Sequence, residues 1–188
     1  MSGLRALAAF ALAVSANASI LLAADTGTAR EIDPSASKVE FAVQHIYVEQ
    51  VTGTIPILRG TVVLSPGSTI PQSVSAVLDP TRIKTGEDDR DGALQTPDWF
   101  DSKRFPTWSF VSSKITPSGK DAFTMDGALT IHGVARSEHL DATVTGTPAH
   151  PLYRATGTID RHAFGMTVTR LDPVIGNPVD VTLDIVLR

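Results

Sequence analysis

Cysteine is absent from all 188 residues of this chain. Without a thiol, the protein cannot form a disulfide, a thiolate nucleophile, a cysteine-ligated zinc site or an iron–sulfur cluster. Basic residues are also few, with 16 Lys and Arg against 20 Asp and Glu, giving a net charge of −4. Nucleic-acid binding needs basic side chains gathered in a stripe that neutralises phosphates, and no such run occurs. We therefore exclude nucleic acid as a partner.

Long hydrophobic runs are missing after Ala24. A membrane-spanning helix needs about 20 consecutive apolar residues, so we expect no integral membrane span in the mature chain. Before that point, residues 1–24 are typical of a secretory signal peptide. Arg5 supplies the positive start, residues 6–14 are an unbroken apolar run, and small residues follow with cleavage expected after Ala18 or Ala24. We expect a periplasmic or secreted protein with one mature domain over residues 25–188.

β-Branched residues are abundant, with 17 Val, 12 Ile and 21 Thr, and 14 Gly and 12 Pro are spread among them. This composition favours many short strands joined by turns. Apolar and polar residues alternate along segments such as 39–43, 123–131 and 179–187, which predicts about eight strands. Consecutive antiparallel strands in that number form two sheets or close into a barrel with room for one small ligand.

The alternation breaks between residues 85 and 104, where we expect one or two short helices. Thr96 before Pro97 fits a helix start, with threonine as the cap and proline at the first helical position. The acidic stretch 87–91 lacks the glycine and glutamate that an EF-hand calcium loop requires. It is therefore interpreted as a solvated acidic loop with Arg90 as its counter-charge.

Signatures of enzymes and metal sites are missing as well. The chain has no phosphate-binding loop and no G-x-S-x-G motif, and its 5 histidines are scattered without H-x-H or H-E-x-x-H spacing. We assign no catalytic residue, no metal and no cofactor.

Several short motifs follow one another along the chain: 32–33, 37–41 and 43–45, then 90–91 with Leu94, 98–101, 105–106 with Phe110, 127–133, and Arg161 with 164–165. In this order they resemble the YceI-like family of exported, lipocalin-like barrels that bind polyisoprenoids and related long-chain amphiphiles. Two departures stand out. The family often has a histidine where this chain has Gly92-Ala93, and it usually has phenylalanine where this chain has Trp99.

The resemblance implies a single antiparallel lipocalin-like barrel and a soluble periplasmic protein that carries, stores or scavenges an isoprenoid-like lipid. Trp99 and Phe100 would cover the mouth of the barrel. The candidates for contact with the lipid tail are Phe41, Val43, Trp99, Phe100, Phe110, Leu129 and Ile131. The candidates for contact with a polar headgroup are His45, Arg90 and His132, each of which also suits a structural role at a barrel end.

Two other functions remain open at this point. A barrel packed solid with side chains would make an interaction module whose outer strands pair with a partner or with a second copy in a homodimer. An enzyme acting on an amphiphile is the other alternative, although no nucleophile–base arrangement is legible. A hollow interior favours the carrier, and a filled interior favours the interaction module.

The first prediction concerns export. The mature N-terminus is expected between Ser19 and Asp25, because both cleavage sites fall there. An intact-mass measurement on the exported protein checks this. An exported form that keeps residues 1–22 would show that they are an anchor or a helix instead.

Overall fold

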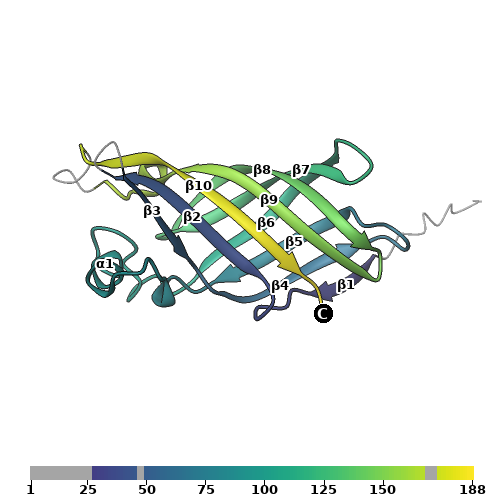
Figure 1. Cartoon of the computed structure of the whole chain (residues 1–188), viewed down its shortest axis with the longest axis horizontal. Helices are drawn as coiled ribbons and strands as arrows, with labels where there is room; N and C mark the ends of the chain where they lie inside the picture. Colours follow the sequence, from purple (N-terminus) through teal and green to yellow (C-terminus); the bar gives the residue numbers. More distant parts are fainter. Residues whose placement is uncertain (1–26, 46–48, 168–172) are drawn as a thin grey trace, which may run out of the picture.

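A computed structural model describes residues 27–45, 49–167 and 173–188 (Figure 1). The expected signal peptide lies outside these residues. The described residues form a ten-stranded antiparallel sheet with few helices. The strands are β1 (Thr28–Glu31), β2 (Lys38–His45), β3 (Glu49–Thr54), β4 (Ile57–Leu64), β5 (Pro71–Leu78), β6 (Trp108–Pro117), β7 (Ala122–Ile131), β8 (Val134–Thr147), β9 (His150–Asp160) and β10 (Ile175–Val186). The helices are η1 (Pro80–Arg82), α1 (Asp88–Leu94) and η2 (Arg161–Phe164).

The sheet has the order β1-β4-β5-β6-β7-β8-β9-β10-β2-β3 and curls into a half-barrel (Figure 1). Its edge strands are β1 and β3. Through Ile55 and Pro56 the chain passes from β3, at one edge of the sheet, to β4, which lies next to β1 at the other edge. A single bridge between Ile32 and Leu187 joins the end of β1 to the end of β10. The expectation of an all-β antiparallel fold is therefore confirmed.

The expected number of about eight strands was wrong, because the sheet has ten. The sequence of β1, Thr28–Glu31, does not alternate in polarity, and three of its four residues are exposed. Its position is set by pairing with β4 and by the adjacent Ile32, which is 2% exposed. A polar strand of this kind carries no period-two signal that a sequence reading can detect.

The segment between residues 85 and 104 contains one α-helix, α1, within the expected range. No helix starts at Thr96, contrary to the expected cap. Its hydroxyl instead donates to the carbonyl of Ala93 at 2.7 Å, and its carbonyl accepts from the backbone N–H groups of Trp99 and Asp101. Asp101 has a left-handed backbone with φ of 42°, which ends any helical run at that residue.

The core follows the predicted alternation. Phe123, Met125, Leu129 and Ile131 of β7 are all at most 7% exposed. Ala128, which lies between two of these residues, is exposed. Successive side chains of a strand point to opposite faces, so the odd-numbered residues of β7 face the barrel interior.

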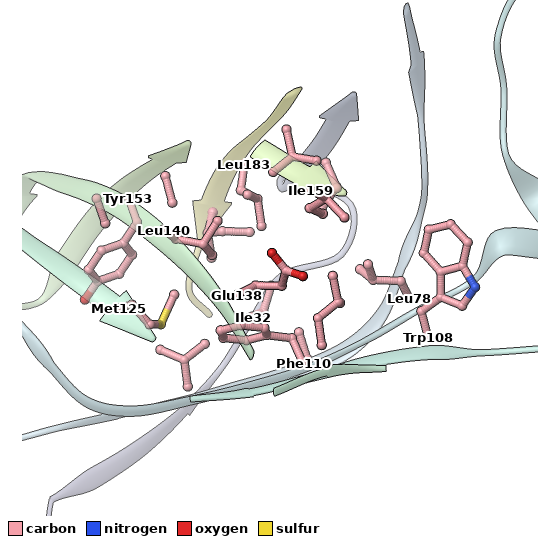
Figure 2. A pocket seen from close by; sticks show the side chains of 18 of the residues that line it. Ile32, Leu78, Trp108, Phe110, Met125, Glu138, Leu140, Tyr153, Ile159 and Leu183 are labelled. Carbon is pink, nitrogen blue, oxygen red and sulfur yellow. The ribbon is translucent and has the colours of Figure 1, made fainter. Parts of the chain in front are cut away.

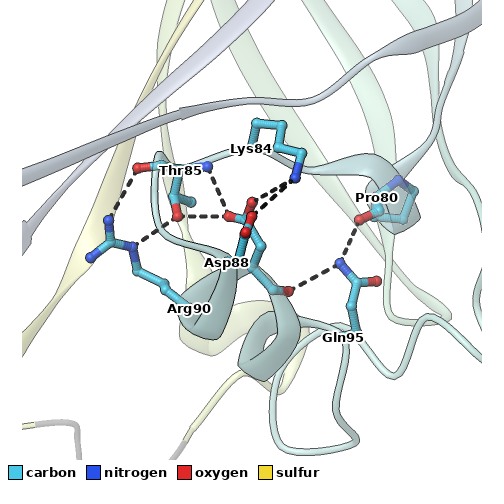
Figure 3. Close-up of polar contacts among 7 residues, drawn as sticks. Pro80, Lys84, Thr85, Asp88, Arg90 and Gln95 are labelled. Carbon is cyan, nitrogen blue, oxygen red and sulfur yellow. Dashed lines mark hydrogen bonds and ion pairs between the residues drawn. The ribbon is translucent and has the colours of Figure 1, made fainter.

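A polar network fastens α1 to the chain segment that precedes it (Figure 3). The carboxylate of Asp91 accepts from the backbone N–H of Thr85 at 2.8 Å and from its hydroxyl at 2.7 Å, and lies 3.3 Å from Lys84 Nζ. Arg90 Nε donates to the same hydroxyl at 2.9 Å. The acidic stretch is therefore a helix with one buried carboxylate, which corrects its interpretation as a solvated loop.

The network predicts unequal roles for two neighbouring carboxylates. Replacing Asp91 by alanine leaves buried donors of Thr85 without an acceptor, so Asp91→Ala is expected to lower the free energy of unfolding by about 1–3 kcal/mol. The side chain of Asp88 is 99% exposed, so Asp88→Asn should change the free energy of unfolding by at most about 0.5 kcal/mol. Urea denaturation of both variants measures the difference.

The contribution of Asp91 to the free energy of unfolding should also depend on pH. Burial alone would raise the pKa of Asp91, but the hydrogen bonds from Thr85 and the charge of Lys84 lower it below its usual 3.8. A carboxyl with a lowered pKa stabilises the fold above about pH 4, and this stabilisation disappears as the pH falls through the folded-state pKa. The difference between wild type and Asp91→Ala should therefore shrink in acid. A constant difference down to pH 2 would contradict this assignment.

Candidate functional site

Two adjoining apolar cavities lie inside the half-barrel. The central cavity has a volume of about 130 Å³ and lies among the strands (Figure 2). The helix-end cavity, of about 100 Å³, is bounded by Leu94 of α1, by Trp99 and Phe100, and by Met166 after η2. A set of side chains lines both cavities and forms a shared wall: Phe41, Ile55, Trp108, Ile131, Ile159 and Val181.

Every residue predicted to contact a lipid tail lines one or both cavities. Phe110 and Leu129 line the central cavity, and Phe41 and Ile131 belong to the shared wall. The remaining tail candidates line the helix-end cavity: Val43, Trp99 and Phe100. The structure thus brings together side chains from distant parts of the sequence around one apolar interior.

The predicted headgroup residues do not line either cavity. His45 ends β2, with Nδ1 3.7 Å from a carboxylate oxygen of Glu49. Arg90 is held in the α1 network by Thr85. His132 and Gly133 form the tight turn between β7 and β8, with φ of 53° and 74°, as a two-residue hairpin of this kind requires.

Two aromatic rings lie against glycines of neighbouring strands. Gly53 faces Phe41 across the β2–β3 pair, and a Cβ on Gly53 would lie 2.4 Å from the Phe41 ring. Gly127 is close to Phe110 across the β6–β7 pair, where a Cβ would lie 2.3 Å from the ring. Because the glycines have no side chains, the rings approach the backbone of the neighbouring strand closely.

A buried guanidinium, that of Arg161, lies in the lining of the helix-end cavity. Arg161 begins η2, is 3% exposed, and donates to the carbonyls of Gly176 and Ile175 at 2.9 Å each and to that of Met166. Its guanidinium carbon lies 5.7 Å from the centre of the Trp99 ring. Arg161 therefore joins the segment after η2 to the start of β10 and supports the Trp99 indole from one face.

Tyr153 lies on the lining of the central cavity, far from the helix-end cavity. Its hydroxyl donates to the carbonyl of Thr69 at 2.9 Å, and its ring meets that of Phe123 edge to face. Burial raises the pKa of Tyr153 to about 12. The phenol is therefore neutral at physiological pH, and its one polar atom is satisfied by the backbone.

The family of the chain follows from comparison with known proteins. A family model described as the YceI-like domain matches residues 31–187. The chain belongs to the YceI-like family. The match begins near the end of β1 and ends beyond β10, so it covers all the strands that surround the two cavities.

Relatives of this YceI-like protein include two UPF0312 proteins, each of which aligns with about 70% of the chain. A UPF0312 protein of Pseudomonas fluorescens is 30% identical over 138 residues, covering 68% of this chain and 70% of the relative. A UPF0312 protein of Staphylococcus aureus is 26% identical over 141 residues, covering 71% of this chain and 80% of the relative.

Solved structures share the fold of this YceI-like protein. BcnA of Burkholderia cenocepacia superposes with a TM-score of 0.74 at 24% identity, covering 82% of this chain and 98% of that one. A polyisoprenoid binding domain from Saccharophagus degradans, implicated in plant cell wall breakdown, superposes with a TM-score of 0.64 at 16% identity, covering 84% and 97%. At these identities the likeness shows the fold alone.

The predicted contact residues do not include the one acidic side chain that lines the central cavity of this YceI-like protein. Glu138 lines the central cavity from β8, where it shares the inward parity of Leu140, Ala142 and Val144. Extending that alternation by one step toward the N-terminus would have found it. An acid at an inward position interrupts the apolar half of the pattern, so alternation of apolar residues alone does not single it out.

Metal-binding clusters and membrane-spanning helices are both absent from the described residues. Among them, no group of three or more His, Asp or Glu side chains is arranged to hold a metal ion. In the same part of the chain, no helix has the length and apolar character needed to cross a membrane.

The contact between Gly127 and Phe110 gives a prediction for the cavity of this YceI-like protein. In Gly127→Ala, the added Cβ would also lie 2.7 Å from the carbonyl oxygen of Val111, so the strand and the Phe110 ring must both shift. Overpacking of this kind costs about 1–3 kcal/mol, which urea denaturation measures. Gly119→Ala is the matched control, because a Cβ there meets only Ala122 at 3.6 Å. Equal stability of the two variants would contradict the close contact.

Proposed function

We propose that this protein is a soluble periplasmic binding protein that holds an isoprenoid-like or other long-chain amphiphilic lipid inside the barrel. The observation that carries the proposal is the pair of adjoining apolar cavities with their shared wall. The family match and the polyisoprenoid-binding domain among its structural neighbours support the same class of ligand. In this role the protein carries, stores or scavenges lipid and catalyses no reaction.

The size of the cavities defines how a lipid enters. An engineered protein cavity of about 150 Å³ accepts one benzene molecule, so the central cavity by itself holds only a small part of a lipid tail. A long tail must run through both cavities and displace side chains of the shared wall. Phe41 and Trp108 are the largest of these, and their movement joins the two cavities into one channel.

The energy of tail burial is sufficient for tight binding. Burying about fifteen tail carbons contributes about 12 kcal/mol gross, at about 0.8 kcal/mol per methylene. Immobilising the tail and moving the wall side chains reduce this value. The half-buried Trp99 and the buried Phe100 lie at the helix end, where we place the mouth of the channel.

Native mass spectrometry tests the proposal directly. Protein purified from its own host is expected to carry a bound mass that organic extraction releases as a long-chain lipid. Protein that is consistently empty, and that also fails to bind added prenyl lipids, would contradict the proposal. In that case the interaction-module function would be favoured. Turnover of the bound lipid would favour an enzyme instead.

Leu129→Arg provides a test by mutation. Leu129 is 7% exposed and lines the central cavity, where an unpaired guanidinium is costly to desolvate. The variant is expected to lose lipid binding before folding or together with it. Wild-type protein should gain about 2.7 kcal/mol of stability at a lipid concentration of 100 times Kd, measured by thermal melts.

The control for Leu129→Arg is the same change on the outer face. Val111 of β6 is 54% exposed, so Val111→Arg should melt normally and keep its stabilisation by lipid. Asp88→Asn, in the exposed part of α1, should also retain both properties. A Leu129→Arg protein that behaves like these controls would show that lipid does not occupy the central cavity.

A further inference from the structure

Glu138 is an acidic side chain in an otherwise apolar lining. Its inward position follows from its place on β8, two residues before the buried Leu140. Its cross-strand neighbour on β7 is Gly127, and the ring of Phe110 lies against that glycine. Figure 2 shows the carboxylate extending among the apolar side chains of the central cavity, between Phe110 and Ile159.

The carboxylate of Glu138 has no partner among the described residues: neither a hydrogen bond nor an ion pair joins it to them. The indole Nε1 of Trp108, on the shared wall, also has no hydrogen-bond partner among the described residues, but it is a neutral donor. Tyr153 is bonded to Thr69, and Arg161 is bonded to several carbonyls. A partly buried carboxylate without a partner is unfavourable, so a ligand that supplies one gains binding energy at this point.

The electrostatic surroundings favour a positive partner. Burial, and in second place the charge of Asp160, raise the pKa of Glu138. Asp160 itself stays ionised: burial opposes this, but hydrogen bonds that include one from the backbone N–H of Ala163 lower its pKa. Asp160 is exposed and lines neither cavity, so Glu138 is the carboxyl group that faces the central cavity. The guanidinium of Arg161 donates to backbone carbonyls.

We propose that Glu138 makes the central cavity selective for amphiphiles that carry a basic amine on a long apolar chain. The chain lies in the two cavities, and the ammonium pairs with the Glu138 carboxylate. A hydroxyl group at the same place donates one hydrogen bond and leaves the negative charge uncompensated. A fatty-acid carboxylate is repelled by Glu138. This inference rests on the proposed function, because it requires the cavities to take up an apolar chain.

The experiment compares three ligands with one chain length. Decylamine, decanol and decanoate are titrated below their aggregation limits into wild-type protein at pH 7 and low salt, by isothermal calorimetry. Decylamine is expected to bind at least tenfold more tightly than decanol, and decanoate more weakly than either. Since this ranking needs no variant, it tests the inference even if substitutions at Glu138 disturb folding.

Glu138→Gln tests the residue itself, because it keeps the size of the side chain and removes its charge. Its affinity for decylamine is expected to fall about tenfold, to that of decanol, while decanol binding stays the same. Asp141→Asn is the matched control, since Asp141 lies on the same strand with its side chain 77% exposed. It should keep the wild-type ranking.

The possible failures are distinguishable. Equal binding of decylamine and decanol by the wild type, or a preference for decylamine that survives in Glu138→Gln, would overturn the inference and leave the lipid-binding function standing. Failure of all three ligands to bind would overturn the inference together with the proposed function.

Discussion

The whole structure depends on one curled sheet whose alternation sends every second side chain into a shared interior. Because the strands pair antiparallel and in register, inward residues of β2, β6, β7, β8, β9 and β10 converge on the same space. A shift of one residue in any of these strands would exchange its two faces. The apolar interior is therefore a consequence of register as much as of composition.

Glycines opposite aromatic rings keep that interior from filling. The ring over Gly53 or Gly127 occupies the space that a side chain of the neighbouring strand would fill. A β-carbon at either glycine would displace the ring of Phe41 or Phe110. Small barrels are commonly filled by their own side chains, so these two pairs explain why cavities persist here.

Polar groups in the interior fall into two kinds. Tyr153 and Arg161 are satisfied by backbone carbonyls and stabilise the two ends of the apolar space. Glu138 is not satisfied by the protein, and it lies between these ends on the central cavity.

The sequence by itself determined the all-β antiparallel fold class, the inward faces of the main strands and seven of the side chains that line the cavities, because period-two alternation is a local property of the chain. It missed β1, whose polar residues form a strand only through pairing with β4 and the burial of Ile32. Only the tertiary structure decided that Arg90 and His132 serve the α1 network and the β7–β8 turn, and that Glu138 faces an apolar cavity. These assignments depend on which distant segments become neighbours, and that information is not contained in local periodicity.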